Sequence, residues 1–214
     1  MENNFTLLVG DCINELKKLE DCSVDSIVTD PPYGISIDHN KWDSFSSNFR
    51  FQKWCSLWAA ECLRILKPGG HIVSFSSNRT YHRMVVGLED AGFEIRDMVN
   101  WLYFSGMPKG TSFGRKDESL SGWATGLKPA SEPIVLARKP IQEKTVLQQM
   151  QKTRTGGLNI DACRFSAKDD CWVGPKNEDF VKAWDAPVKS NFTSGGKLFV
   201  ADKDQYHYRD LSSY

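Results

Sequence analysis

The stretch "SIVTDPPYGIS" (residues 26–36) decides how this chain folds, because it brings a strand to an abrupt end. Its apolar start predicts the buried part of a strand. The two prolines after Asp30 cannot donate to a hydrogen-bond ladder, so a central strand must end there. A proline pair also fixes the backbone. The strand therefore leads into a rigid corner, Asp30-Pro31-Pro32-Tyr33, which carries an acid and an aromatic ring.

Around this corner, strand and helix patterns alternate up to about residue 91. Alternation of this kind predicts a parallel sheet covered by helices, and two final strands without a clear helix between them predict an antiparallel edge. Residues 34–50 lack a sustained period and predict a mobile loop. We expect strands at 5–12, 24–30, 71–77, 93–104 and 132–140, with helices at 13–22, 51–66 and 79–92.

After Pro140 the regular alternation stops. The stretch 145–165 predicts a short helix followed by turns, and 166–196 is polar and irregular. We therefore expect a core over residues 1–140 and a second, irregular region over 141–214.

Composition sets the broad class of protein. The chain has 214 residues, of which 40% are hydrophobic and 25% charged, so it can bury a core. It contains no apolar run of 18 residues and its start lacks a charged segment before an apolar one, so we expect neither a membrane span nor a signal peptide. Its six cysteines form no CxxC pair and it has four histidines. We expect no metal site, and reduced thiols in the cytoplasm.

Charge is uneven along the chain although the formal net charge is zero. Between Met107 and Arg154 there are nine Lys or Arg residues and four Asp or Glu residues. A local basic excess can follow a phosphate backbone, and it can also be a solvated surface. Charge alone favours the solvated surface and leaves the phosphate backbone as the alternative.

The corner suits chemistry on an aromatic amine. In open α/β sheets, ligands bind outside the carboxyl ends of the strands, where Asp11 and Asp30 are both expected. The nitrogen of such an amine is a poor nucleophile, because its lone pair is delocalised into the ring. A carboxylate and a backbone carbonyl that each accept one N–H can restore the lone pair, and a tyrosine offers a face on which the base stacks.

Several blocks of the sequence resemble one enzyme family. Asp30-Pro31-Pro32-Tyr33 resembles the catalytic motif of the amino-methylating DNA methyltransferases. "LLVGDCINELKKLEDCSVDSIVTDPPYG", "AAECLRILKPGGHIVSF", "GFEIRDMVNWLYFSGMPKG", "LKPASEPIVLARKPI" and "GGLNIDACRF" follow in order over most of residues 5–165. The chain is similar to the β-class adenine-N6 DNA methyltransferases of bacteria and phages, enzymes of restriction–modification systems.

The resemblance implies a fold, a cofactor and roles. The fold would be the class I, Rossmann-like methyltransferase fold, with a mixed, mostly parallel sheet and an antiparallel edge strand. The enzyme would transfer a methyl group from S-adenosylmethionine to the N6 amine of an adenine flipped out of double-stranded DNA. Asp30 and the Pro31 carbonyl would hold the amine, and Tyr33 would stack on the base. Asp11 and Cys12 would contact the adenine of the cofactor, together with Asp30, although Asp11 could equally be a helix cap.

Further residues are expected to contact DNA. Trp42, Asp43 and Phe45 lie in the loop that tends to cover the site in this family, although plain packing explains them as well. Basic residues follow the turn at 106–108 or end the basic stretch, and these are expected to meet phosphates. The candidate DNA-binding residues are Trp42, Lys109, Arg115, Lys116 and Arg154.

One part of the family pattern is not found. No strand ends in Asp-Pro-Phe before a Gly-x-Gly turn, which is the form of the family's methionine-binding loop. We therefore expect the methyltransferase fold to be incomplete in this chain, and completed by a further C-terminal half, a partner polypeptide or a homodimer. Two alternatives to an adenine methyltransferase stay open. One is a non-catalytic DNA-binding or regulatory remnant without the cofactor, and the other is a cytosine-N4 methyltransferase. The expected location is the cytoplasm of a bacterium or a phage-infected cell.

Overall fold

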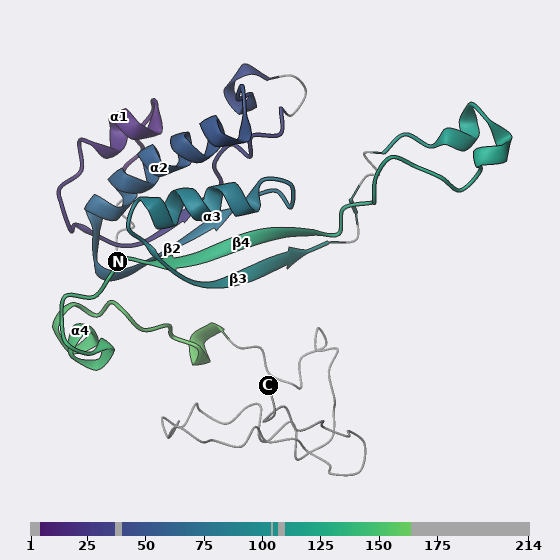
Figure 1. Cartoon of the computed structure of the whole chain (residues 1–214). Helices are drawn as coiled ribbons and strands as arrows, with labels where there is room; N and C mark the ends of the chain where they lie inside the picture. The colour runs from purple at the N-terminus through teal and green to yellow at the C-terminus, as the bar shows by residue number, and fades with distance from the viewer. Residues whose placement is uncertain (1–4, 37–39, 104, 107–109, 164–214) are drawn as a thin grey trace, which may run out of the picture. The chain divides into compact units, whose positions relative to one another are not determined.

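The computed structural model describes residues 5–36, 40–103, 105–106 and 110–163. They contain a four-stranded sheet with the order β1-β2-β4-β3 (Figure 1). The strands are β1 (Val24–Thr29), β2 (Leu66–Phe75), β3 (Glu94–Leu102) and β4 (Ser131–Arg138). β1 runs parallel to β2, whereas β4 is antiparallel to both of its neighbours. The mixed sheet and its antiparallel edge are confirmed. The described residues hold one parallel pairing and two antiparallel ones, where a mostly parallel sheet was expected.

The helices are close to their predicted positions. They are α1 (Cys12–Leu16), α2 (Asn48–Ile65), α3 (Tyr81–Asp90) and α4 (Val146–Thr153). Single 3-10 turns occur at Lys41–Asp43, Phe113–Arg115, Glu118–Leu120 and Asp161–Cys163. Figure 1 shows α2 and α3 side by side over one face of the sheet. The chain divides into two compact units, Met1–Gly157 and Leu158–Tyr214.

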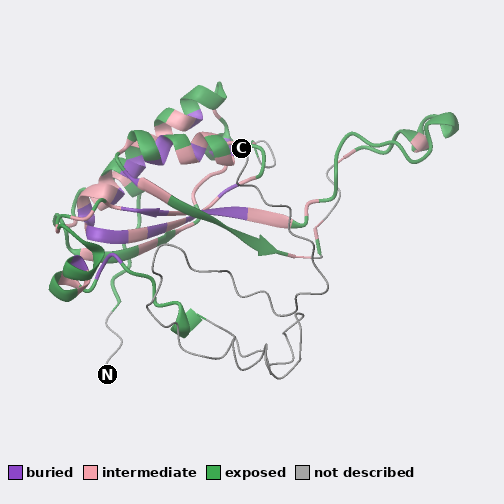
Figure 2. Cartoon of the chain, turned by 60° about the horizontal axis from the view of Figure 1, so that its bottom comes forward, coloured by how far each residue is buried: buried purple, intermediate pink, exposed green. Residues whose placement is uncertain are grey.

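The core lies between this helix pair and the sheet. The apolar period predicted for α2 is the one that the core uses, because Phe51, Trp58 and Cys62 are all buried there. They pack with residues of β2, α3 and β4 such as Ile72 and Leu88. Figure 2 shows the buried positions as purple bands on the inner sides of these elements. Burial of this apolar surface provides most of the stabilisation.

The "LKPGG" turn does more than end a helix. α2 ends at Ile65 as predicted, but the turn is also the first half of β2. The pairing of β1 with β2 shifts register within it, so Val24 faces Leu66 while Ser26 faces His71. Gly69 has a φ of +80°, and a Cβ there would stand 3.0 Å from the backbone of Gly156. Glycine is therefore required where the segment after α4 packs on the turn.

The strand predicted at 5–12 is wrong. Residues 5–10 pair with no strand in the described part of the chain, and α1 begins at Cys12. An isolated apolar run cannot form a strand, because its backbone groups need a partner in a ladder. The side chains of Phe5, Leu7 and Val9 are instead 88%, 77% and 83% exposed.

This absence changes the position of β1. We expected Asp30 to follow a central strand, whereas β1 pairs on one side alone within the described sheet. Val28, which reads as a buried strand residue, is 73% exposed. The expectation of a central strand is therefore wrong for the described sheet.

The described residues contain neither a membrane-spanning helix nor a metal-binding cluster. None of their helices is both long and apolar enough to cross a bilayer. They also bring together no group of three or more His, Cys, Asp or Glu side chains that could hold a metal ion.

Candidate active site

The corner lies at the carboxyl end of β1. β1 ends at Thr29, so Asp30 follows the strand directly, as predicted. Because β1 and β2 are parallel, the end of β2 reaches the same edge of the sheet. β4 is antiparallel to β2, so its beginning lies at that edge too. Three strands therefore bring residues that are far apart in the sequence to one edge.

Hydrogen bonds from two other elements fix the backbone of the corner. The Thr80 hydroxyl, just before α3, donates to the Tyr33 carbonyl at 2.6 Å. The Asp43 carboxylate accepts from the backbone N–H groups of Gly34 and Ile35 at 2.6 and 3.2 Å. Asp43 is completely buried. The prolines therefore stiffen the corner from within, and these bonds hold it from outside.

Gly34 ties the corner to α2. Its φ is +69°, and an added Cβ would stand 2.7 Å from the Phe51 ring. A larger residue would strain the backbone and push against a core aromatic.

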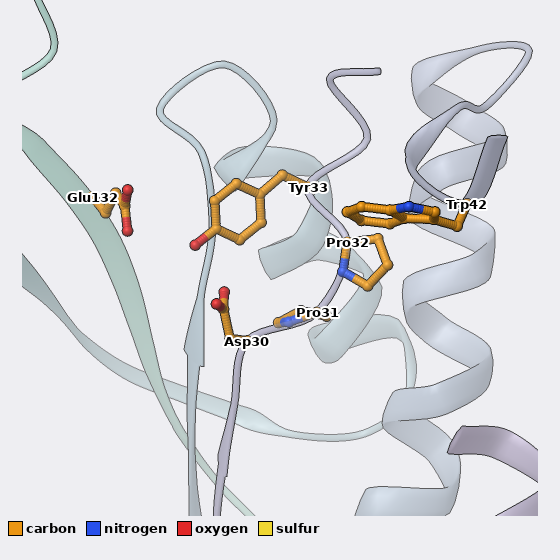
Figure 3. A pocket seen from close by; sticks show the side chains of 6 residues that line it. All are labelled: Asp30, Pro31, Pro32, Tyr33, Trp42 and Glu132. Carbon is orange, nitrogen blue, oxygen red and sulfur yellow. The ribbon is translucent and has the colours of Figure 1, made fainter. Parts of the chain in front are cut away.

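The loop after the corner divides into packing residues and one exposed ring. Phe45 packs against Phe51 and Trp54, with ring centroids 5.2 and 5.4 Å away. Asp43 holds the backbone of the corner through its hydrogen bonds. Structural roles therefore account for both Phe45 and Asp43. Trp42, in contrast, is 59% exposed and lies beside Pro32 at the mouth of a cavity (Figure 3).

Two cavities meet at the corner. The first has a volume of about 420 Å³, and the second, of about 140 Å³, adjoins it. Tyr33 and Glu132 contribute to the walls of both. The first is lined by Asp30, Pro31, Pro32, Tyr33, Trp42 and Glu132. The second is lined by Tyr33, Ile35, Ser77, Asn78, Tyr103, Pro129, Ser131 and Glu132. Aromatic faces and a few polar groups are the usual lining of a site for a planar ligand.

Carboxylates dominate the electrostatics of the first cavity. The Tyr33 hydroxyl points toward the gap between the Asp30 and Glu132 side chains (Figure 3). Burial, followed by Asp30 and then by Glu132, raises the pKa of Tyr33 well above its usual value. Tyr33 therefore stays a neutral hydrogen-bond donor at physiological pH.

Glu132 was missed by the sequence analysis. It is the second residue of β4, and the residues around it predict the start of a strand and no functional role. The predicted antiparallel edge was the one feature that could have identified Glu132. An acid at the start of a strand that runs against β2 must lie at the edge where β1 and β2 end.

Of the three residues expected at the cofactor, Asp30 alone lines the first cavity. Asp11 accepts a hydrogen bond from the Asn14 N–H at 3.1 Å and is the N-cap of α1, which was the alternative interpretation. Neither Asp11 nor Cys12 lines either cavity. Residues 5–10 are in no strand, so Asp11 does not follow a strand end as was expected.

The candidate DNA contacts lie on separate segments. Residues 103–130, which we call the arm, join β3 to β4. Backbone hydrogen bonds between Phe113 and Trp123 and between Thr125 and Thr111 hold its two limbs together. Arg115 and Lys116 are exposed on the arm, whereas Lys109 lies outside the described residues. Arg154 is exposed at the end of α4.

Comparison with known proteins gives a consistent family. The profile of the DNA methylases N6_N4_Mtase matches residues 24–207. The type II methyltransferase M.HindIII of Haemophilus influenzae strain Rd is 26% identical over 197 residues, which cover 70% of this chain and 63% of that protein. M.HinfI of Haemophilus influenzae is 31% identical over 136 residues, covering 55% and 38%. The structure of the cytosine-N4-specific PvuII DNA methyltransferase shares 17% identity over 65% of this chain and 51% of that one, with a TM-score of 0.46.

These matches differ in what they establish. The family profile covers most of the chain. The chain spans less than two thirds of the length of these two curated relatives. The structural likeness, at its low TM-score, adds nothing to the fold described above.

Proposed function

We propose, because the chain belongs to the N6_N4_Mtase family of DNA methylases, that its corner binds a base flipped out of double-stranded DNA and presents the amine of that base for methylation. S-adenosylmethionine, the methyl donor of this family, would supply an electrophilic methyl group. The observation that carries the proposal is the corner itself. Asp30 and Tyr33 face a common cavity at the carboxyl end of a strand, with Trp42 at its mouth.

The groups at the corner suit this chemistry. The Asp30 carboxylate and the Pro31 carbonyl would each accept one N–H of the exocyclic amine. Two acceptors at fixed positions favour a pyramidal nitrogen, which exposes the lone pair and develops positive charge as the methyl group arrives. Tyr33 and Trp42 would contact the faces of the base, which needs new stacking partners once it leaves the duplex. The first cavity, at about 420 Å³, is large enough for a nucleobase.

We favour the N6 amine of adenine as the methyl acceptor. An acid at the first position of the corner resembles the adenine enzymes, whereas the family includes both N6 and N4 methylases. Incubation with unmethylated genomic DNA and labelled S-adenosylmethionine, followed by nucleoside mass spectrometry, decides between the two. Label in N4-methylcytosine would refute the adenine assignment and leave the role of the corner intact.

A second candidate function is a DNA-binding or regulatory protein that retains the base pocket and transfers no methyl group. It is favoured by one observation, namely that Asp11 and Cys12 lie outside both cavities. In this candidate function the described residues would hold the base and would not by themselves hold the cofactor. Calorimetric titration of the chain with S-adenosylmethionine separates the candidates. Low-micromolar binding by this chain alone would exclude the second, and no measurable binding would favour it.

The proposal predicts the effect of Asp30→Asn. This change keeps the size of the side chain but removes the charged acceptor, so methyl transfer should fall on the order of a hundredfold or more. Binding to duplex DNA and thermal unfolding should be close to wild type. The matched control is Asp25→Asn, because Asp25 lies exposed at the other end of β1 and pairs with Lys67. Full activity in Asp30→Asn would remove Asp30 from the mechanism.

A further inference from the structure

We propose that Glu132 positions Tyr33 by accepting the hydrogen bond of its phenol hydroxyl, which fixes the ring and leaves the Asp30 carboxylate available for the substrate amine. The inference rests on the proposed function for its consequence in methyl transfer. Tyr33 and Glu132 line the same two cavities, so the proposed hydrogen bond between them can be tested without any activity.

Glu132 and Asp30 reach the site from different strands. Asp30 follows β1 and Glu132 lies in β4, and β2 separates these two strands in the sheet. Glu132 faces Trp101 of β3 in the ladder and is half-buried. In Figure 3 both carboxylates face the Tyr33 hydroxyl, that of Glu132 from across the cavity and that of Asp30 from below. The hydroxyl is therefore placed where either acid can accept its hydrogen.

The ring of Tyr33 needs such a restraint. Its backbone is fixed by Thr80, but its side chain borders the first cavity and also the second. A ring with open space on more than one side is not held by packing, because few atoms contact it there. A polar contact at the hydroxyl is then what selects one orientation. An oriented ring offers the base a fixed face to stack on.

The number of hydrogens available for donation links Glu132 to Asp30. A neutral phenol has one hydrogen to donate, whereas ionised carboxylates are acceptors alone. If Tyr33 donated to Asp30, its hydrogen bond would draw charge from the carboxylate and weaken it as an acceptor for the amine. Donation to Glu132 avoids this weakening. Glu132 is thus a positioning residue, since it acts through Tyr33 and not on the reacting nitrogen.

The contact itself can be tested by NMR at neutral pH with tyrosine labelled with ¹³C at Cζ, whose frequency reports hydrogen bonding of the phenol. Tyr33→Phe identifies the Tyr33 resonance. Glu132→Ala should shift that resonance, and Glu132→Gln, which keeps an acceptor oxygen, should shift it less. Glu89→Ala, at an exposed acid of α3, should leave it unchanged. A Tyr33 resonance unmoved in a folded Glu132→Ala chain would overturn the proposal.

The consequence for catalysis is tested by a double-mutant cycle on methyl transfer to unmethylated genomic DNA. Glu132→Ala should lower kcat ten- to a hundredfold, the order expected for a misplaced group, with a smaller effect on KM for DNA. Glu132→Gln should recover part of the rate. In a Tyr33→Phe background Glu132→Ala should add little further loss, since the partner is already gone. Fully additive losses would contradict a role through Tyr33. Failure of the wild-type chain to transfer methyl groups would count against the proposed function, and the NMR result would still decide the contact.

Discussion

Single residues at the corner show how much of the site depends on buried polar contacts. Asp43 is the clearest case, because one carboxylate satisfies two backbone N–H groups and so ties the loop that carries Trp42 to the corner. Tyr33 is held in a similar way through its carbonyl by Thr80. Neither contact touches the proposed substrate. Both set where the groups that would touch it can lie.

We predict that Asp43→Ala destabilises the chain by a few kcal/mol. The change leaves the Gly34 and Ile35 N–H groups without their acceptor, and each unsatisfied buried donor costs about 1–3 kcal/mol. Urea unfolding measures the loss. Asp90→Ala is the matched control, because the Asp90 side chain accepts a bond from Gln52 at the surface, where little should be lost. Equal stability of the two variants would show that Asp43 does not hold the backbone of the corner.

At this scale the sequence predicted the residues that are adjacent in the chain and missed those that are not. Asp30, Pro31, Pro32 and Tyr33 form one continuous motif, so their chemistry could be inferred together. Glu132 comes from a strand about a hundred positions away, and only the sheet order brings it to the corner. Lys109 lies outside the described residues, and its role stays a prediction.

Among the elements, the arm carries exposed basic and aromatic side chains. Trp123 is 67% exposed on it, and Arg115 and Lys116 lie exposed at its first 3-10 turn. Tyr103 and Pro129, at its base, line the second cavity. The arm is thus continuous with the site that we propose binds DNA.

We predict that Arg115→Glu with Lys116→Glu weakens binding to duplex DNA and flattens its salt dependence. Each lost phosphate contact should lower the slope of log affinity against log salt by about 0.9. Fluorescence anisotropy over a salt series measures both. The control is Lys17→Glu with Lys53→Glu, which changes the net charge equally on α1 and α2. An unchanged slope in the arm variant would mean that these charges are simply solvated.

Helices were predicted more reliably than strands for a physical reason. The period of α2 is contained in its own sequence, and burial of one face is enough to form it. A strand depends on a partner elsewhere in the chain. The run at 5–10 has the composition of a strand, but it forms none because it has no partner strand in the described residues. β3 and β4 pair with each other and form as predicted.

At the scale of the whole sheet, the described residues leave two edge strands, β1 and β3. β1 ends the sheet with a free edge in the described residues, and the exposed Val28 lies on it. Phe5, Leu7 and Val9 add further apolar surface nearby in the sequence. Natural sheets usually cover or charge such edges, because unpaired backbone groups recruit other strands.

We predict that the chain associates with itself through this edge. Sedimentation velocity should show a mass that rises with concentration, and Val28→Lys should reduce the rise by placing a charge on the edge. Leu57→Lys is the control, since Leu57 is 60% exposed on α2, away from the strand edge. A wild-type chain that stays monomeric over the same range would show that the edge is protected.

The attachment of the corner to α2 and α3 has a thermodynamic consequence. Because Gly34 rests on Phe51 and Thr80 holds the Tyr33 carbonyl, the pocket is ordered when the chain folds. Little conformational entropy is then left to lose when a base enters. The free-energy cost of base entry falls almost wholly on the nucleic acid, as lost stacking and pairing. Bases that are already weakly paired would therefore enter most readily, whatever sequence surrounds them.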